Sequence, residues 1–277
     1  MLFFPNAKIN IGLNITEKRP DGFHNIETVF YPIGLCDILE FTEIKDPSKG
    51  IASNLISSGI YIGNNKNENL CIKAYYLFKN DFNLPKIDIH LHKKIPIGAG
   101  LGGGSSDSAF MLRKLNEYFQ LNLSNQKLNS YADKLGSDCT FFIENKPVFA
   151  VEKGNKLKIV NLNLSDYYIM LVYPNIHINT SEAFSKINTI KPDSSLEKIV
   201  QEPIENWKNL IKNDFEPVIF KKHPIIEEIK NKLYSNGAIY ASMSGSGSAV
   251  YGIFKDIPKK NKFNNYFVWQ GKLKNEL

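Results

Sequence analysis

Pro96-Ile97-Gly98-Ala99-Gly100-Leu101-Gly102-Gly103-Gly104-Ser105-Ser106-Asp107 is the stretch around which the chain is organised. Five glycines lie between positions 98 and 104, and two hydroxyl groups and a carboxylate follow them. Glycine lets the backbone adopt positive φ and lets a ligand approach bare amide groups. The pattern predicts a strand over 88–92 before the loop and a helix over 108–120 after it. A loop at a helix N-terminus favours anions, so we interpret this one as a binding loop for nucleotide phosphates.

A flexible connector is the alternative interpretation of a glycine run. Here apolar segments flank the run closely on both sides, and a connector would have no need of Pro96 or Leu101. The run lacks the Gly-Lys-Ser/Thr of a Walker A loop and the spacing of a dinucleotide-binding loop. The chain also lacks the strand lysine and the His-Arg-Asp set of protein kinases. The sequence therefore indicates a phosphate-binding loop of a different type.

Composition sets broad limits on the protein. The chain has 277 residues, 43% of them hydrophobic and 22% charged, as in ordinary globular proteins, and this length suits one large or two medium domains. A net charge of +6 favours anionic ligands without choosing between a nucleotide and a nucleic acid. Three widely spaced cysteines predict neither a disulfide framework nor a metal site and favour the cytoplasm. We find neither a leader peptide nor a long apolar run, so we expect a soluble protein.

Hydrophobic periodicity predicts alternating strands and helices along the chain. In the first half, the predicted strands cover 1–15, 28–33, 37–44, 60–62, 147–153 and 156–160, and the helices cover 69–79 and 124–135. In the second half, the strands cover 167–173, 238–243, 249–254 and 266–270, and the helices cover 180–187, 196–220 with kinks at Pro203 and Pro217, and 224–236. The order strand, helix, helix, strand, strand in the second half predicts a two-layer α+β domain, with helices on one face of an antiparallel sheet.

Two charged residues are candidates for chemistry, each with an ordinary alternative. Lys8, Asn10 and Asn14 share one side of the predicted first strand, although such a polar row is commonly a solvent-facing side. Asp138 stands at a break between a predicted helix and the apolar run 141–143, where an aspartate also serves as a helix cap or turn former.

Three motifs, in order along the chain, resemble those of the GHMP kinases, the family of galactokinase, homoserine kinase, mevalonate kinase and phosphomevalonate kinase. The first is Ala7-Lys8-Ile9-Asn10-Ile11, the second is the glycine stretch, and the third is Ser242-Met243-Ser244-Gly245-Ser246-Gly247. The triple glycine and the turn Asp21-Gly22-Phe23-His24 are similar to one branch of the family. That branch phosphorylates the tertiary 2-hydroxyl of a cytidine diphosphate conjugate in isoprenoid precursor synthesis.

The resemblance implies a two-domain α+β fold. We expect residues 1–160 to form an ATP-binding α/β domain like those of certain ribosomal proteins. We expect residues 161–277 to form a ferredoxin-like α+β domain on the substrate side. The implied cofactors are ATP and Mg²⁺, and the implied partner is a small-molecule substrate. We expect a cytoplasmic monomer or homodimer that binds neither nucleic acid nor membrane.

The resemblance also implies roles for individual residues. Asp138, in Gly136-Ser137-Asp138-Cys139-Thr140-Phe141-Phe142, would be the catalytic base, with Lys8 as its charged partner. Residues 96–106 with Gly245, Ser246 and Gly247 would bind ATP. Mg²⁺ prefers oxygen ligands, so Ser105 and Ser106 are both candidates. The residues implied on the substrate side are Asn10, Phe23, His24, Thr180 and Phe184, with Phe23 and Phe184 enclosing the cytosine ring.

Some positions depart from the family pattern. Tyrosine is more usual at position 23; phenylalanine keeps the stacking but loses any hydrogen bond from the hydroxyl. Asp107 and Ser108 stand where Asn-Ala is more usual. Ordinary alternatives remain for His24 as a turn residue and for Phe184 as a core residue.

Two other functions fit parts of the sequence. A GHMP kinase that acts on mevalonate, homoserine or a sugar would keep the phosphate site, but the turn at 21–24 argues against it. An RNA-binding α/β protein would interleave basic and aromatic residues along its strands and would have no use for Asp138. That interleaving is absent from the sequence.

Overall fold

The computed structural model describes residues 1–44, 54–63, 65–185, 187, 189, 192, 194–259 and 263–274. The chain divides into two compact units. Unit 1 contains residues 1–7, 35–97 and 102–145. Unit 2 contains residues 8–34, 98–101 and 146–277. The predicted boundary at residue 160 cuts the chain into two continuous segments, whereas each unit here contains several segments. That boundary therefore stays a prediction.

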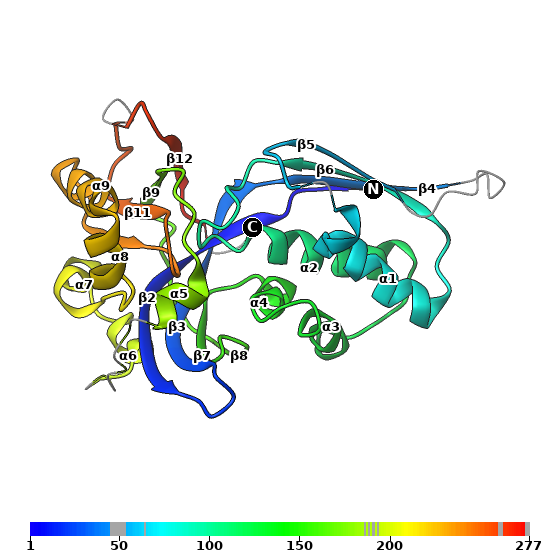
Figure 1. Ribbon diagram of the computed structural model, residues 1–277, viewed down its shortest axis with the longest axis horizontal. Coiled ribbons are helices and arrows are strands. Elements are labelled where there is room, and N and C mark those ends of the chain that lie inside the picture. The colour runs from blue at the N-terminus through cyan, green and yellow to red at the C-terminus, as the bar shows by residue number, and fades with distance from the viewer. Residues whose placement is uncertain are drawn as a thin grey trace. The chain divides into compact units, whose positions relative to one another are not determined.

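Unit 1 contains a four-stranded sheet with helices on one side (Figure 1). In spatial order its strands are β1 (Leu2–Phe3), β4 (Ile38–Glu43), β6 (Ile87–Lys93) and β5 (Asn54–Gly59). Every second side chain of β6 is buried, as expected for a strand with one face covered by helices. β5 runs parallel to β6, whereas the other pairs are antiparallel. The strand expected over 60–62 was wrong, because the chain pairs with β6 over the preceding residues and leaves the sheet at Gly59.

The helices of unit 1 are η1 (Lys66–Glu68), α1 (Leu70–Phe82), α2 (Gly103–Tyr118), α3 (Asn125–Ala132) and α4 (Cys139–Glu144). The side chain of Asn69 caps α1, which therefore begins one residue later than expected, and that of Ser124 caps α3. α2 begins five residues before the predicted start at 108, because Gly103 and Gly104 adopt helical conformations in its first turn. α3 ends at Ala132 rather than at residue 135; Gly136 does not adopt a positive φ and is no left-handed cap.

Unit 2 contains two four-stranded sheets. The first has the order β2 (Asn6–Lys18), β3 (His24–Cys36), β7 (Val148–Glu152) and β8 (Lys156–Ile159). The second has the order β10 (Tyr240–Met243), β11 (Val250–Phe254), β9 (Tyr168–Tyr173) and β12 (Phe267–Lys272), with antiparallel pairing throughout. The turn predicted at residues 19–22 joins β2 to β3, and Gly22 there has a φ of 83°.

The helices of unit 2 are α5 (Thr180–Ser185), α6 (Leu196–Ile199), α7 (Ile204–Leu210), α8 (Glu216–Lys222) and α9 (Pro224–Ser235). Apolar residues of α8 and α9 share a buried cluster with residues of β9, β10 and β11, beside which Figure 1 shows them. The expected kinked helix over 196–220 is instead three separate helices. Pro203 precedes α7 and Pro217 lies in the first turn of α8, positions where a missing N–H costs no helical hydrogen bond.

The predicted α+β class is confirmed by these separate layers of strands and helices. Among the described residues, no helix combines the length and the apolar character needed to cross a lipid bilayer.

Candidate active site

The first part of the glycine loop lies against the third motif within unit 2. Gly100 has a φ of +79°, and a Cβ atom added to it would lie 2.0 Å from the carbonyl oxygen of Ser244. The Ser244 hydroxyl donates a hydrogen bond to the Gly100 carbonyl over 2.8 Å, and the Ala249 N–H donates to the Ala99 carbonyl over 3.2 Å. A side chain at position 100 would separate these backbones, so this approach requires glycine.

Lys8 is buried on β2 beside the same loop. Its backbone N–H donates to the Leu101 carbonyl over 3.0 Å. Its ammonium group donates to Asn10 Oδ1 over 2.6 Å and lies 4.8 Å from the centre of the Phe30 ring. These contacts fix the position of the cation next to the chain segment 98–101.

Asn10 is itself buried and orients Lys8. Its Nδ2 donates to the Thr28 hydroxyl over 2.9 Å, and Thr28 in turn donates to the Gly12 carbonyl over 2.6 Å. The Ser244 hydroxyl also contacts Asn10, accepting from its N–H over 3.2 Å. With its amide engaged in this way, Asn10 holds the cation in place; its predicted contact with a substrate stays a prediction.

Two residues that sequence reasoning missed hold the third motif. Asn213 Nδ2 donates to the carbonyls of Met243 over 2.9 Å and Gly245 over 2.8 Å. Glu216 accepts hydrogen bonds from the Met243 N–H over 2.9 Å and from the Ser242 hydroxyl over 3.2 Å. The signal in the sequence is a short polar cluster at 213–216 between two apolar segments.

The last part of the glycine loop forms the N-terminus of α2, in unit 1. The first helical bond runs from the Ser106 N–H to the Gly102 carbonyl over 2.8 Å. The Ser106 hydroxyl is buried and has no hydrogen-bond partner among the residues that the structure describes. The unbonded N–H groups of the first turn and the positive end of the helix dipole both favour an anion there. An orphaned hydroxyl at this point is a suitable ligand for a phosphate-bound cation.

Asp138 is the residue that precedes α4, also in unit 1. It occupies the N-cap position, but its side chain makes no capping hydrogen bond, so the ordinary alternative of a helix cap is wrong. The thiol of the next residue, Cys139, lies 3.4 Å from the Ser108 hydroxyl on α2. α4 therefore begins beside the first turns of α2. Lys8 belongs to unit 2 and Asp138 to unit 1, so their pairing stays a prediction.

A buried ion cluster that sequence reasoning missed contacts the first turns of α2. The Lys93 ammonium, at the end of β6, donates to Asp37 Oδ2 and, over 2.8 Å, to Asp107 Oδ2. All three side chains are buried. Burial raises the pKa of Asp107 to about 7, against the lowering effect of Lys93. We call Asp37, Lys93 and Asp107 the buried triad.

Three of the residues implied on the substrate side, His24, Thr180 and Phe184, make contacts at two places within unit 2. The ring of His24 stacks on that of Phe184, with centroids 4.8 Å apart and an angle of 14° between the planes. The Thr180 hydroxyl, at the start of α5, hydrogen-bonds the Ser246 hydroxyl over 3.0 Å and so joins α5 to the third motif. Burial, together with the charge of Lys18, lowers the pKa of His24.

Phe23 stands apart from this stack. Its side chain is 59% exposed, and the Lys153 ammonium lies 4.2 Å from the centre of its ring. In this structure, therefore, His24 rather than Phe23 faces the ring of Phe184. The predicted enclosure of a cytosine ring between Phe23 and Phe184 stays a prediction.

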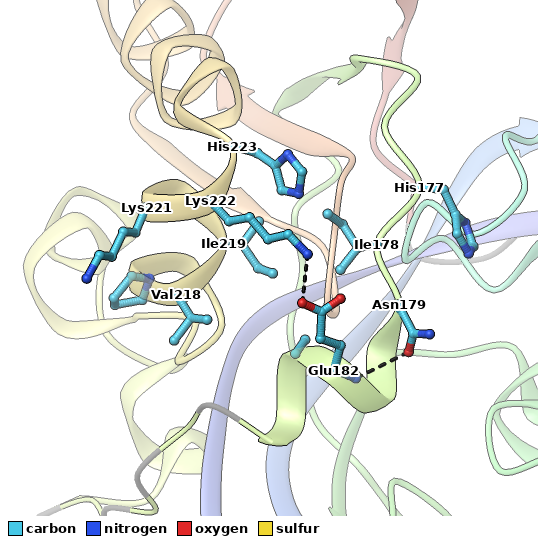
Figure 2. Close-up of a pocket in the computed structure, with 11 residues that line it drawn as sticks. His177, Ile178, Asn179, Glu182, Val218, Ile219, Lys221, Lys222 and His223 are labelled. Atoms are coloured by element: carbon cyan, nitrogen blue, oxygen red, sulfur yellow. Dashed lines mark hydrogen bonds and ion pairs between the residues drawn. The ribbon is translucent and has the colours of Figure 1, made fainter.

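A pocket of about 750 Å³ lies between α5 and α8 (Figure 2). Ile178, Ala183 and Ile219 supply buried apolar lining, and Lys222 of α8 bonds Glu182 of α5 over 2.7 Å. None of the predicted site residues is among its lining residues. Asn179, Glu182 and Ala183 line the pocket, whereas Thr180 and Phe184 make the contacts with Ser246 and His24 described above.

Comparison with known proteins identifies the family. Residues 69–145 match the family described as GHMP kinases N terminal domain, and residues 195–264 match GHMP kinases C terminal. The chain is 53% identical over 276 residues to the 4-diphosphocytidyl-2-C-methyl-D-erythritol kinase of Bacteroides fragilis, with 99% of this chain and 100% of that protein covered. The chain belongs to the GHMP kinase family. It is therefore a kinase, and its family uses ATP.

Other GHMP kinases are similar over nearly the whole chain. The protein of the same name from Cytophaga hutchinsonii is 46% identical over 260 residues, with 94% of each chain covered. A crystal structure of 4-(cytidine 5'-diphospho)-2C-methyl-D-erythritol kinase superposes with a TM-score of 0.81 at 27% identity, covering 98% of each chain. The mevalonate kinase of Methanococcus jannaschii has a TM-score of 0.70 at 15% identity, covering 99% of this chain and 98% of that one, and shares the fold.

Proposed function

We propose that the protein transfers the γ-phosphoryl group of ATP to the 2-hydroxyl of 4-diphosphocytidyl-2-C-methyl-D-erythritol. The observation that carries this proposal is the 53% identity, over 99% of the chain, to a kinase named for that substrate. The three motifs quoted from the sequence agree with it. So does the geometry within unit 2, where the first and third motifs and residues 98–101 meet through Lys8, Ser244 and Gly100.

ATP would bind along residues 96–106 and the turn Gly245-Ser246-Gly247. The close approach of Gly100 to Ser244 and the unbonded amides of the first turn of α2 support this assignment. The loose transition state of phosphoryl transfer carries charge on the γ-phosphoryl oxygens. Backbone amides that are already oriented stabilise that charge without further reorganisation.

Mg²⁺ would be held by a serine hydroxyl together with phosphate oxygens. Within the described part of the chain, no group of three His, Cys, Asp or Glu side chains is arranged to bind a metal. The buried hydroxyl of Ser106, which has no hydrogen-bond partner among the described residues, supports Ser106 in this role. When bound, Mg²⁺ supplies neutralisation of phosphate charge.

Asp138 would accept the proton of the acceptor hydroxyl. The hydroxyl oxygen bonds the γ-phosphorus, the bond to the β–γ bridging oxygen breaks, and ADP leaves as the proton passes to the carboxylate. Its position directly ahead of α4, which begins beside the first turns of α2, supports this role. Lys8, oriented by Asn10, would offset charge on the transferring group.

On the substrate side, we assign the cytidine diphosphate group to the surroundings of His24 and Phe184. The stacked rings form a flat aromatic surface, on which a cytosine ring would replace one partner. Thr180 would bind on the phosphate side, next to Ser246. Phe23 would join the cytosine site only if it left Lys153, which makes it the least supported member.

The test is a coupled assay of ADP release with four acceptors: the cytidylyl substrate, mevalonate, homoserine and galactose. We expect turnover with the first alone. Turnover with one of the other three in its place would move the protein to another branch of the family.

The same assay tests the base. We expect Asp138→Asn to lower kcat by about 10³-fold, within the usual range for loss of a general base, while the Kd for ATP stays within about twofold. Asp133→Asn, on the same segment before α4, is the matched control and should keep normal turnover. A normal kcat in Asp138→Asn would remove this residue from the mechanism.

We also propose a cytoplasmic protein, either a monomer or a homodimer, with no nucleic-acid partner. The three cysteines support the location, since the structure shows all of them as free thiols. Light scattering of the purified protein would distinguish the two oligomeric states.

A further inference from the structure

The buried triad joins the two ends of the phosphate-binding stretch. Lys93 is the last residue of β6 and lies three residues before Pro96, the start of the stretch. Asp107 lies in α2, immediately after Ser106. The Lys93 ammonium bonds the carboxylate of Asp107 over 2.8 Å. A buried ion pair thus links Lys93, which precedes segment 94–106, to Asp107, which follows it.

Asp37 fixes the first of these ends. Its Oδ2 accepts a hydrogen bond from the Lys93 ammonium, while its Oδ1 accepts from the backbone N–H groups of Lys94 over 2.6 Å and Ile95 over 2.9 Å. The chain entering Pro96 is therefore held by three bonds to one carboxylate. Because Asp37 is fully buried, water does not compete for these bonds.

The second end is packed just as closely. A Cβ atom added to Gly103, the first residue of α2, would lie 2.9 Å from Ile95 Cγ2 and 3.2 Å from the Lys93 ammonium nitrogen. The first turn of α2, which contains Ser106, thus rests directly on the side chains of Lys93 and Ile95. A shift of the ammonium would shift this turn.

Asp107 is the unusual member of the triad. Its Oδ1 is buried without a hydrogen-bond partner among the described residues, and only Oδ2 contacts Lys93. Asp37 and Asp107 thus depend on one ammonium, and loss of that cation would leave both carboxylates buried without a counter-ion.

We propose that Lys93 is a positioning residue for the phosphate loop. This inference rests on the proposed function, because it assigns ATP to residues 96–106. The ammonium acts through Asp37 on the backbone of residues 94–95, and through Asp107 and Gly103 on the first turn of α2.

The first test measures the KM for ATP in Lys93→Met and Asp107→Ala. We expect both to raise it about tenfold or more, while the KM for the cytidylyl substrate stays within about twofold. Tyr131→Phe is the control, since it removes the 2.5 Å bond to Asp81 in the same unit, away from the loop, and should leave both KM values unchanged. Wild-type KM values for ATP in Lys93→Met and Asp107→Ala would overturn the proposal.

The second test uses a variant that keeps the shape of the side chain. In Asp107→Asn the amide oxygen can still accept the hydrogen bond from Lys93. We expect the KM for ATP in Asp107→Asn to stay close to that of the wild type, whereas it rises in Asp107→Ala. An equal rise in both variants would show that the bond to Lys93 does not position the loop, and it would overturn the proposal.

Gly100→Ala separates failure of this inference from failure of the proposed function. If Gly100→Ala raises the KM for ATP and Lys93→Met does not, only the positioning role is wrong. If Gly100→Ala leaves the KM unchanged, the assignment of ATP to the loop is wrong, and the positioning role falls with it.

Discussion

Lys93 in unit 1 and Lys222 in unit 2 make similar ion pairs in opposite surroundings. The side chains of Lys93, Asp37 and Asp107 are at most 4% exposed. Lys222 bonds Glu182 at the pocket over 2.7 Å, with the side chains 50% and 44% exposed (Figure 2). Removing one charge from the buried cluster leaves the others unpaired and away from water. Separating Lys222 from Glu182 exposes both charges to water. Burial therefore decides what each contact contributes, although the bond lengths are alike.

The largest effect should follow removal of the buried cation. We expect Lys93→Met to lower the free energy of unfolding by about 3–5 kcal/mol, because it leaves two buried carboxylates without a counter-ion. Urea denaturation at pH 7 measures this change. A loss below about 1 kcal/mol would mean that the buried triad contributes no more than a surface pair, and the comparison would fail.

The second prediction concerns the pH dependence of stability. The pKa of Asp107 is raised from 3.8 to about 7 in the folded protein, so folding retains a proton that the unfolded chain releases between these values. The free energy of unfolding contributed by this group therefore falls as pH rises from about 4 to about 7, and it stays low above that. We expect Asp107→Asn to lack this fall and to exceed the wild type at pH 8 by on the order of a few kcal/mol.

Urea denaturation of both proteins at pH 5 and pH 8 tests this prediction, since the other titrating groups are common to the two. A difference that does not change with pH would show that Asp107 is ionised throughout, and the triad would then be an ordinary buried ion cluster.

The smallest effect should come from the exposed pair. We expect Lys222→Met and Glu182→Gln each to lower the free energy of unfolding by less than about 1 kcal/mol, and we expect the loss to shrink further in 0.5 M salt. The KM for ATP should not change. A loss of more than about 2 kcal/mol that persists in salt would mean that this pair holds α5 against α8. Solvent exposure would then not explain the difference in stability contribution between Lys93 and Lys222.

Helices whose capping residue and apolar period both stand in one short segment could be predicted from the sequence. Ser124 precedes periodic apolar residues and caps α3, as such a residue predicts, whereas Asn69, expected inside the helix 69–79, caps α1 instead. The start of α2 was missed because glycine ordinarily disfavours helix interiors, and only packing against Lys93 and Ile95 makes Gly103 suitable there. Pro203 and Pro217 were interpreted as kinks because periodicity continues through them, although each marks the start of a new helix.

The site divides in the same way. The glycine loop, Lys8 and Asp138 could be predicted as site residues because the motifs that contain them are contiguous; their roles stay predictions. Asp37 and Lys93 are 56 positions apart, and Asn213 is 30 positions from the carbonyl of Met243 that it bonds. No periodic or local pattern links such residues, so their roles were missed.

By itself, the sequence determined the α+β class and the family and predicted the phosphate-binding stretch, because glycine runs, caps and hydrophobic periods act through neighbouring residues. Only the tertiary structure decided which charges are buried together and which glycine has no room for a side chain. The physical reason is that desolvation and close packing depend on what the rest of the chain places around a group, which residue type and spacing do not state.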